Sequence, residues 1–366
     1  MTTLTPLELD NASAVVATNE TPVRRAAPPG FIQLGIAQAI PTLLHHYGLA
    51  ADQLMEEAGL DPRLFLHPDN LIPVGALGRL LLLCAERAHC PHFGLLVGQL
   101  STLASLRAVG ALMQSSSTFG AAIRGMNTHL RVQNRGAVTQ LDVQEGFATF
   151  FYAPYDPSGA GAIHIIDGAL ATAICVFREL CGSHFAPTEV LIPRRRPIDT
   201  TPYRTLFRAP VRFNQESAAI VFPDCWLTKS IPSADPAVHN ALELEIVACE
   251  QTSPSGLQEE LRRLLRAELV KARSSASEVA QLLSIHRRTL NRYLKAEGTA
   301  FRTVADEVRF GIARQLLEDT DLPLVEIAAA LDFSEPAAFT RAFHRWSGST
   351  PSAWRANTKV VQQLAR

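Results

Sequence analysis

The sequence has almost no net charge and lacks the cysteine pairs and long apolar runs of several protein classes. Its 34 Lys and Arg residues nearly balance 35 Asp and Glu residues, for a formal charge of −1. Six scattered cysteines include no Cys-x-x-Cys pair, and no signal peptide is recognised, so a reduced, cytoplasmic setting is expected. The longest apolar run, around residues 80–84, is too short to cross a bilayer, and no membrane contact is expected.

The composition is that of a folded protein with a basic C-terminal part. Hydrophobic residues make up 47% of the 366 positions and charged residues 19%, which predicts two or three globular domains. Residues 251–366 hold 17 Lys and Arg against 13 Asp and Glu, a charge of +4. The remaining 250 residues hold 17 against 22, a charge of −5. The C-terminal part is therefore the better candidate for contact with phosphate.

The N-terminal part is predicted to be an α+β domain. Residues 1–30 show no periodicity and are predicted to be a disordered tail. Helical periodicity follows, and alternation around Glu145-Gly146 indicates a β-hairpin, with a covering apolar helix over residues 160–180. Residues 211–213 and 219–222 are predicted to form another strand pair. Together, residues 31–250 are interpreted as an effector-binding and dimerisation domain, followed by a linker at 251–257.

The C-terminal part is predicted to be all-α, with two helix-turn-helix units over residues 258–358 and a tail at 359–366. In the second unit, one helix starts at Leu324, a turn follows at residues 332–334, and the next helix ends at Trp346. The first unit spans residues 275–298, and a long helix, Phe301 to Glu318, connects the two. Such a connection is expected to place both recognition helices on one side of a duplex, about one turn (~34 Å) apart.

The predicted recognition helices carry the side chains that DNA contact needs. Arginine fits the guanine edge and asparagine the adenine edge, whereas phosphates accept bonds from Arg, Lys, Ser and Thr. In the first unit the candidates are Arg287, Arg288, Asn291, Arg292 and Lys295. In the second they are Ser334, Thr340, Arg341 and Arg345, although Arg341 could instead pair with Glu297, Asp306 or Glu307.

The chain resembles the AraC/XylS family of bacterial transcription regulators. The resemblance rests on Arg288-Thr-Leu-x-Arg-x-Leu-x-x-Glu297-Gly and on Phe333-Ser-Glu-Pro-x-x-Phe-x-Arg-Ala-Phe343, with Trp346 and Pro351 beyond. It implies a transcriptional activator with promoter DNA, a small-molecule effector and RNA polymerase as partners, and it leaves a homodimer open. The family's base-contacting positions fall on Arg288, Asn291, Arg292, Pro336, Ala337, Thr340 and Arg341. Because Pro336 and Ala337 carry no hydrogen-bonding side chain, the first unit is expected to supply most base readout.

Shorter segments of the N-terminal half, such as Phe93-Gly-Leu-Leu-Val-Gly98, resemble the effector-binding domain of one branch of this family. Residues 147–152, 163–177 and 222–226 could line an apolar pocket, and an ordinary core is the competing interpretation. The candidate polar anchors for an effector are Tyr152, His164, Asp167 and Arg178. In the recognition unit, Asp332 stands where the family often has glycine, and Asp tolerates the left-handed conformation that the turn needs.

Two other functions compete with this interpretation. A catalytic N-terminal domain fused to a DNA-binding module would need a nucleophile with a base or metal ligands, and no such group is found. The close spacing of His89, Cys90 and His92 does not suit a tetrahedral site on one helix, so no catalytic residue, metal or cofactor is predicted. The other rival is a ligand-independent dimerisation domain fused to the same module. Residues 194–196, three arginines, are predicted to be a solvated loop.

Overall fold

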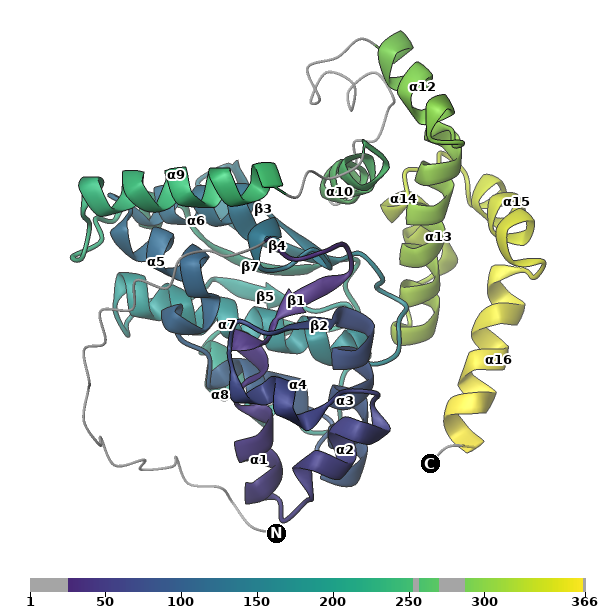
Figure 1. Ribbon diagram of the computed structural model, residues 1–366. Coiled ribbons are helices and arrows are strands. Elements are labelled where there is room, and N and C mark those ends of the chain that lie inside the picture. Colours follow the sequence, from purple (N-terminus) through teal and green to yellow (C-terminus); the bar gives the residue numbers. More distant parts are fainter. Residues whose placement is uncertain (1–25, 253–256, 270–286, 365–366) are drawn as a thin grey trace.

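The computed structural model describes residues 26–252, 257–269 and 287–364. Figure 1 shows an N-terminal α+β domain followed by a group of C-terminal helices. This division agrees with the predicted fold class. The helix expected over residues 275–283, the first helix of the first helix-turn-helix unit, lies outside the described residues.

The predicted hairpin is confirmed. Strands β3 (Ala137–Gln144) and β4 (Phe147–Pro154) pair antiparallel, with Gln144 opposite Phe147. Glu145 and Gly146 in the turn have φ angles of 51° and 84°. Positive φ at both central residues is what a two-residue turn of type I′ requires, since its twist matches that of the strands.

The predicted pairing of residues 211–213 with residues 219–222 is wrong. The five-stranded sheet has the order β3-β4-β7-β5-β6, so β7 (Ala218–Pro223) lies between β4 and β5 (Glu189–Leu191). Strand β6 (Val211–Arg212) instead pairs with β5 in parallel. Parallel neighbours need a crossover connection, and helix α8 (Thr201–Phe207) lies in it.

One face of the sheet packs against helices. An aromatic cluster joins β4 and β7 to α6 and α7 through edge-to-face and tilted ring contacts among Phe119, Phe150, Phe177, Phe185 and Phe222. The helices of this domain are α1 (Ile40–His46), α2 (Ala51–Glu57), α3 (Val74–Arg87), α4 (Phe93–Gln99), α5 (Arg107–Ser115), α6 (Phe119–His129), α7 (Ala162–Cys181) and α9 (Pro236–Thr252). Short elements complete it: β1 (Phe31–Gln33), β2 (Leu71–Pro73), η1 (Leu34–Ala37), η2 (Pro62–Leu66), η3 (Leu103–Leu106), η4 (Leu130–Val132) and η5 (Asp224–Thr228).

Residues 26–30, predicted to belong to the tail, are packed onto this domain. Ala26 and Ala27 are buried, and the backbone N–H of Ala27 donates to the Val132 carbonyl at 2.8 Å. The Gly30 N–H donates to the Arg135 carbonyl at 2.9 Å. The predicted tail boundary at residue 30 is therefore wrong for residues 26–30.

The C-terminal helices form two hydrophobic cores along one long helix, α13 (Phe301–Asp319). The first core joins α13 to α10 (Leu257–Leu269) and α12 (Arg287–Ala296). The second joins it to α14 (Leu324–Ala330), α15 (Pro336–Ser347) and α16 (Pro351–Leu364). The predicted long connecting helix is confirmed.

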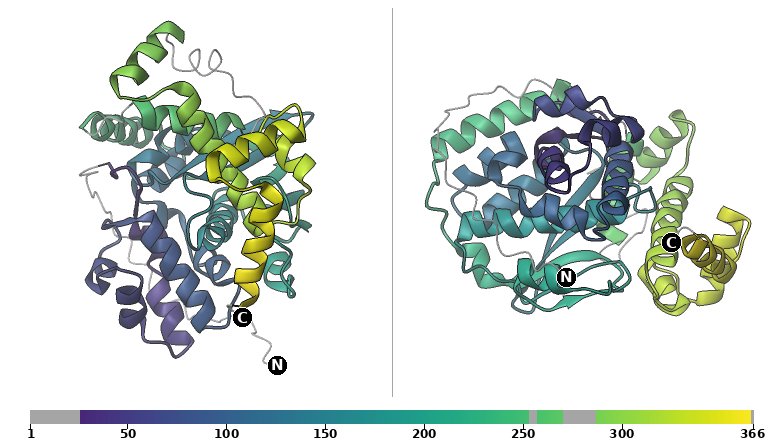
Figure 2. Two further views of the ribbon diagram at one scale, coloured as in Figure 1. Left: turned by 90° about the vertical axis from the view of Figure 1, so that its right-hand side faces the viewer. Right: turned by 90° about the horizontal axis from the view of Figure 1, so that it is seen from below.

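The C-terminal helices lie on one side of the N-terminal domain, as the two views of Figure 2 show. Arg195 joins the two parts through several hydrogen bonds. Its guanidinium donates to the carbonyls of Glu318 (2.7 Å) and Thr320 (3.3 Å) and to the Asp321 carboxylate (3.1 Å). These acceptors lie at the C-terminal end of α13, where a cation is favoured by the helix dipole. The prediction of a solvated arginine loop is therefore wrong at Arg195. It is also wrong at Arg194, whose largely buried guanidinium pairs with Asp167.

Candidate DNA-binding interface and effector cavity

Helix α12 separates its apolar and polar side chains as a recognition helix should. Leu290 and Leu294 are fully buried in the first C-terminal core. Turned outward and exposed on the same helix are the predicted DNA contacts Arg288, Asn291, Arg292 and Lys295. Arg287 begins the helix, and its side chain lies outside the described residues.

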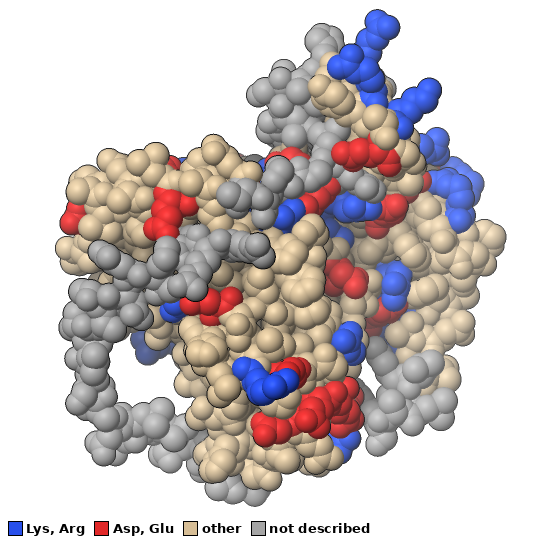
Figure 3. Space-filling view, viewed as in Figure 1, with Lys and Arg blue, Asp and Glu red and all other residues tan. Residues whose placement is uncertain are grey.

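The exposed side of α12 is strongly basic. Figure 3 shows Lys and Arg side chains projecting from the end of the molecule that α12 forms. No ion pair joins Arg288, Arg292 or Lys295 to another residue that the structure describes. The Arg292 guanidinium lies 5.2 Å from the ring centre of Tyr293, an exposed aromatic that the sequence analysis did not single out. Unpaired cations at a protruding helix can approach phosphate without first breaking an internal bond.

The second unit has the predicted helix-turn-helix geometry. Ile327 of its first helix, Leu331 at the end of that helix, and Phe339 and Phe343 of its second helix are fully buried together. Asp332 in the turn has φ = 61°, so the predicted left-handed turn residue is confirmed. The turn is locally supported, since the Phe333 N–H donates to the Ala328 carbonyl at 3.0 Å.

The predicted DNA contacts of the second unit differ in their exposure and in their bonds within the protein. Ser334, Arg341 and Arg345 are exposed, whereas Thr340 is half-buried and its hydroxyl donates to the Pro336 carbonyl at 3.0 Å. Arg345 pairs with Asp306 of α13 at 3.1 Å. Asp306, one of the possible partners of Arg341, thus pairs with Arg345 instead, and among the described residues no ion pair is seen for Arg341.

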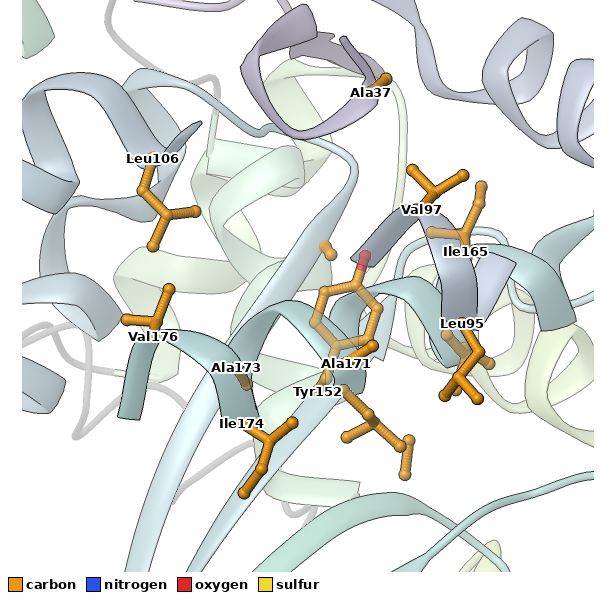
Figure 4. Packing of buried hydrophobic residues seen from close by; sticks show 14 of the residues in the cluster. Ala37, Leu95, Val97, Leu106, Tyr152, Ile165, Ala171, Ala173, Ile174 and Val176 are labelled. Carbon is orange, nitrogen blue, oxygen red and sulfur yellow. The ribbon is translucent and has the colours of Figure 1, made fainter. Parts of the chain in front are cut away.

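The N-terminal domain contains a partly open cavity of about 90 Å³ beneath the sheet. Helix α7 forms one wall, strands β3 and β4 another, and residues of η1, α4 and η3 close it. Figure 4 shows part of its apolar lining, including Ala37, Val97, Leu106, Ile165 and Val176, around the ring of Tyr152. The expectation that residues 147–152 and 163–177 line a pocket is confirmed, whereas residues 222–226 do not line it.

Two of the four predicted effector anchors line this cavity. Tyr152 contributes from β4 and His164 from α7, and both are buried. Burial lowers the pKa of His164 to about 3, so its imidazole is neutral near pH 7. Burial likewise raises the pKa of Tyr152, which stays a neutral phenol. This wall of the cavity is therefore polar but uncharged.

The other two predicted anchors bind within the protein instead. Asp167 is fully buried, pairs with Arg194 and accepts a hydrogen bond from the Tyr203 hydroxyl at 2.7 Å. The Arg178 guanidinium donates to the carbonyls of Leu206 (2.6 Å) and Phe207 (2.9 Å), at the end of α8. Neither side chain lines the cavity, and both fix elements of the domain to one another. Periodicity placed them on the right helix but could not show which neighbour each would meet.

No metal cluster is seen in the described part of the chain. Within residues 26–252, 257–269 and 287–364, no three His, Cys, Asp or Glu side chains are grouped so as to hold an ion. Among these same residues, no single helix is both long and apolar enough to cross a membrane. One pair, Phe93–Gln99 with Leu103–Ser115, meets that test jointly by length and composition, and it is bent by 100°.

An exposed basic recognition helix, a helix-turn-helix unit and a separate domain with an apolar cavity define a ligand-responsive DNA-binding protein. Comparisons with known proteins agree. Residues 48–231 match the model of the arabinose-binding domain of AraC transcription regulators, and residues 279–357 match a helix-turn-helix domain model. The chain belongs to the AraC family of transcription regulators. It is a regulator of this family and not an enzyme, which sets the catalytic rival aside.

Relatives span nearly the whole chain. The ornithine utilization regulator of Pseudomonas aeruginosa is 28% identical over 326 residues, which cover 88% of this chain and 96% of that protein. The HTH-type transcriptional regulator VirS of Mycobacterium tuberculosis is 26% identical over 317 residues, covering 83% and 93%. The crystal structure of the transcriptional regulator CdpR from P. aeruginosa has a TM-score of 0.44 and 25% identity over 84% of this chain and 96% of that chain.

Proposed function

We propose that the two helix-turn-helix units divide the work on promoter DNA. The first reads bases through Arg288, Asn291 and Arg292, with Arg287 and Lys295 beside them. The second positions the protein on phosphates through Arg341 and Arg345, with Ser334 and Thr340 at the start of its recognition helix. The single observation that carries this proposal is the outward set of polar side chains on α12, opposite the buried Leu290 and Leu294, with no ion pair to Arg288 or Arg292 from the described part of the chain.

The division of the chain into two domains supports a mechanism in which a ligand of one domain controls DNA binding by the other. We propose an effector-binding and dimerisation domain that ends near residue 250, a linker at 251–257 and a DNA-binding domain that begins at residue 258. Residues 26–30 pack onto the first domain and helix α16 runs to Leu364, so the predicted tail boundaries at residues 30 and 359 are wrong. Separate hydrophobic cores on the two sides of the linker support this division. Effector binding would shift the population of domain arrangements and thereby the spacing at which the two recognition helices meet DNA.

The remaining proposals concern partners and place of action. From the family resemblance we propose a transcriptional activator that works with RNA polymerase, binds DNA as a homodimer and acts in the cytoplasm, where its promoter lies. Tyr152 and His164 are proposed effector contacts. The name of the P. aeruginosa relative connects that protein with ornithine utilization, but the cavity here offers no carboxylate or guanidinium to pair with a charged amino acid.

A binding-site selection on purified variants tests the division of work. Arg288→Ala should relax preference at one or two base pairs, at a cost of about 1–3 kcal/mol on the specific site and much less on random DNA. Arg345→Ala should weaken binding to all DNA sequences alike. It should also reduce the slope of log K against log salt concentration by about one unit. Arg63→Ala, an exposed arginine of the N-terminal domain, is the control and should change neither. Recovery of an altered motif with Arg345→Ala and an intact one with Arg288→Ala would reverse the proposed roles.

A further inference from the structure

The cavity of the N-terminal domain has no charged side chain in its wall. Among the described residues that line it, none is Asp, Glu, Lys or Arg. Most of the surface is aliphatic or aromatic, from side chains such as Leu106, Phe150 and Val176. An ion that entered would lose its hydration without gaining a partner of opposite charge, which costs several kcal/mol. The wall therefore selects against charged molecules.

Three buried polar atoms of this wall have no hydrogen-bond partner. They are Gln133 Oε1, Thr139 Oγ1 and His164 Nδ1, and all three residues line the cavity. Gln133 is 6% exposed and His164 is 5% exposed, so neither can turn its polar atom to bulk solvent. A buried polar group left unsatisfied is costly, and most such groups in folded proteins do find a partner.

Several other polar residues of the wall already have hydrogen-bond partners. The Thr172 hydroxyl donates to Ser101 Oγ at 3.1 Å, and Asn134 Oδ1 accepts from the Gly136 N–H at 2.9 Å. The lack of partners is thus confined to part of the wall and is not a general property of it. The three residues without a partner come from the end of η4, from β3 and from α7, and all of them line this space.

Taking the cavity as the effector site of the proposed function, we infer that its ligand is an uncharged, largely apolar molecule of about single-ring size with one hydroxyl or carbonyl group. A ligand hydroxyl would donate to Gln133 Oε1, Thr139 Oγ1 or an unprotonated His164 Nδ1, whereas a ligand carbonyl would accept from the Thr139 hydroxyl or from His164 Nδ1–H. The apolar remainder would fill the space beside α7. The size follows from the volume: about 90 Å³ is of the order of apolar cavities of ~150 Å³ that hold benzene.

Four one-ring probes test the ligand class on the full chain by calorimetry and ligand-observed NMR. Benzyl alcohol is neutral with a hydroxyl, toluene is neutral without one, and benzoate and benzylamine carry opposite charges. Benzyl alcohol should bind with a dissociation constant of about 0.1–1 mM, a range set by the small number of its atoms. The two charged probes and L-ornithine should bind at least about tenfold more weakly.

Matched variants test the site. At least one of the variants Gln133→Leu, Thr139→Val and His164→Leu should weaken the binding of benzyl alcohol about fivefold, as expected for the loss of one hydrogen bond. The same variant should leave the affinity for toluene unchanged. Thr172→Val is the control, because it deletes a hydroxyl of the same wall that already has a partner. Ala173→Phe should fill the cavity and abolish binding of both neutral probes. If that variant does not fold, the three polar variants decide.

The results separate this inference from the regulator function. Tighter binding of benzoate, benzylamine or ornithine than of benzyl alcohol would overturn the ligand class, as would polar variants that all leave the affinity for benzyl alcohol unchanged. Unchanged probe binding by folded Ala173→Phe would place the ligand elsewhere and overturn the inference as well. Specific DNA binding is measured by anisotropy on the same samples without probe. Loss of specific DNA binding would count against the regulator function, and it would not affect the inference about the chemical class of the ligand.

Discussion

Replacing Asp167 by asparagine should destabilise the N-terminal domain by breaking a buried ion pair. Asp167 is fully buried, and its partner Arg194 has a side chain that is 12% exposed. The Tyr203 hydroxyl donates to the same carboxylate oxygen and accepts from Arg194 at 2.8 Å. An arginine keeps its charge at any ordinary pH, so Asp167→Asn leaves a buried cation facing a neutral amide.

The expected loss of stability is about 3 kcal/mol. Removing one partner of a buried pair costs about 3–5 kcal/mol, because the other charge stays buried without compensation. Asparagine keeps one oxygen that can accept from Arg194 or Tyr203, which favours the lower end of that range. For a domain of this size, such a loss lowers the melting temperature by roughly 6–12 °C.

Fluorescence of Trp226, which lies in η5 of the N-terminal domain, reports the unfolding of this domain. The other two tryptophans are in the C-terminal helices, so the comparison is made in a Trp346→Phe, Trp354→Phe background. Urea titrations of this protein with and without Asp167→Asn give the change in free energy of unfolding.

A double variant provides the control. Asp167→Asn with Arg194→Met removes the unpaired charge and should be less destabilised than Asp167→Asn alone, so the two effects should not add. Burial raises the pKa of Asp167, and the adjacent Arg194 opposes that rise. A cost below about 1 kcal/mol for the single variant, or additive costs in the double, would show that this carboxyl is protonated in the folded protein and would refute the reasoning.

Three further outcomes are expected. Leu290→Ala should cost about 2–5 kcal/mol in urea unfolding, because the side chain is fully buried beneath the recognition helix; a wild-type transition with lost DNA binding would contradict this. Arg195→Ala should speed amide hydrogen exchange at the end of α13, since three bonds between the domains are lost, and unchanged exchange there would show that other contacts hold the domains together. Burial raises the pKa of Asp319 to about 7, so the folded protein holds a proton between about pH 4 and 7 that the unfolded chain has released. Stability should therefore fall as the pH rises through that window, and Asp319→Asn should remove this part of the slope in unfolding at pH 5 and 8.

Local sequence patterns determined the elements of the C-terminal domain. The spacing of Leu290 and Leu294, and of Phe339 and Phe343, follows one face of a helix, and all four side chains are buried. The turn conformation at Asp332 and the hairpin turn at Glu145-Gly146 were also predictable. These features depend on residues a few positions apart, where helical and strand periodicity and turn chemistry act directly.

The tertiary structure alone decided which polar residues meet. Asp167 and Arg178 lie on the predicted helix, yet each binds a partner that no periodicity could name. Arg195 contacts Asp321, which is 126 positions away, and so turns a predicted loop residue into a contact between domains. The cavity likewise gathers Gln133, Thr139 and His164 from different elements. Contacts of this kind depend on how whole elements pack, and a single sequence carries no local signal for that packing.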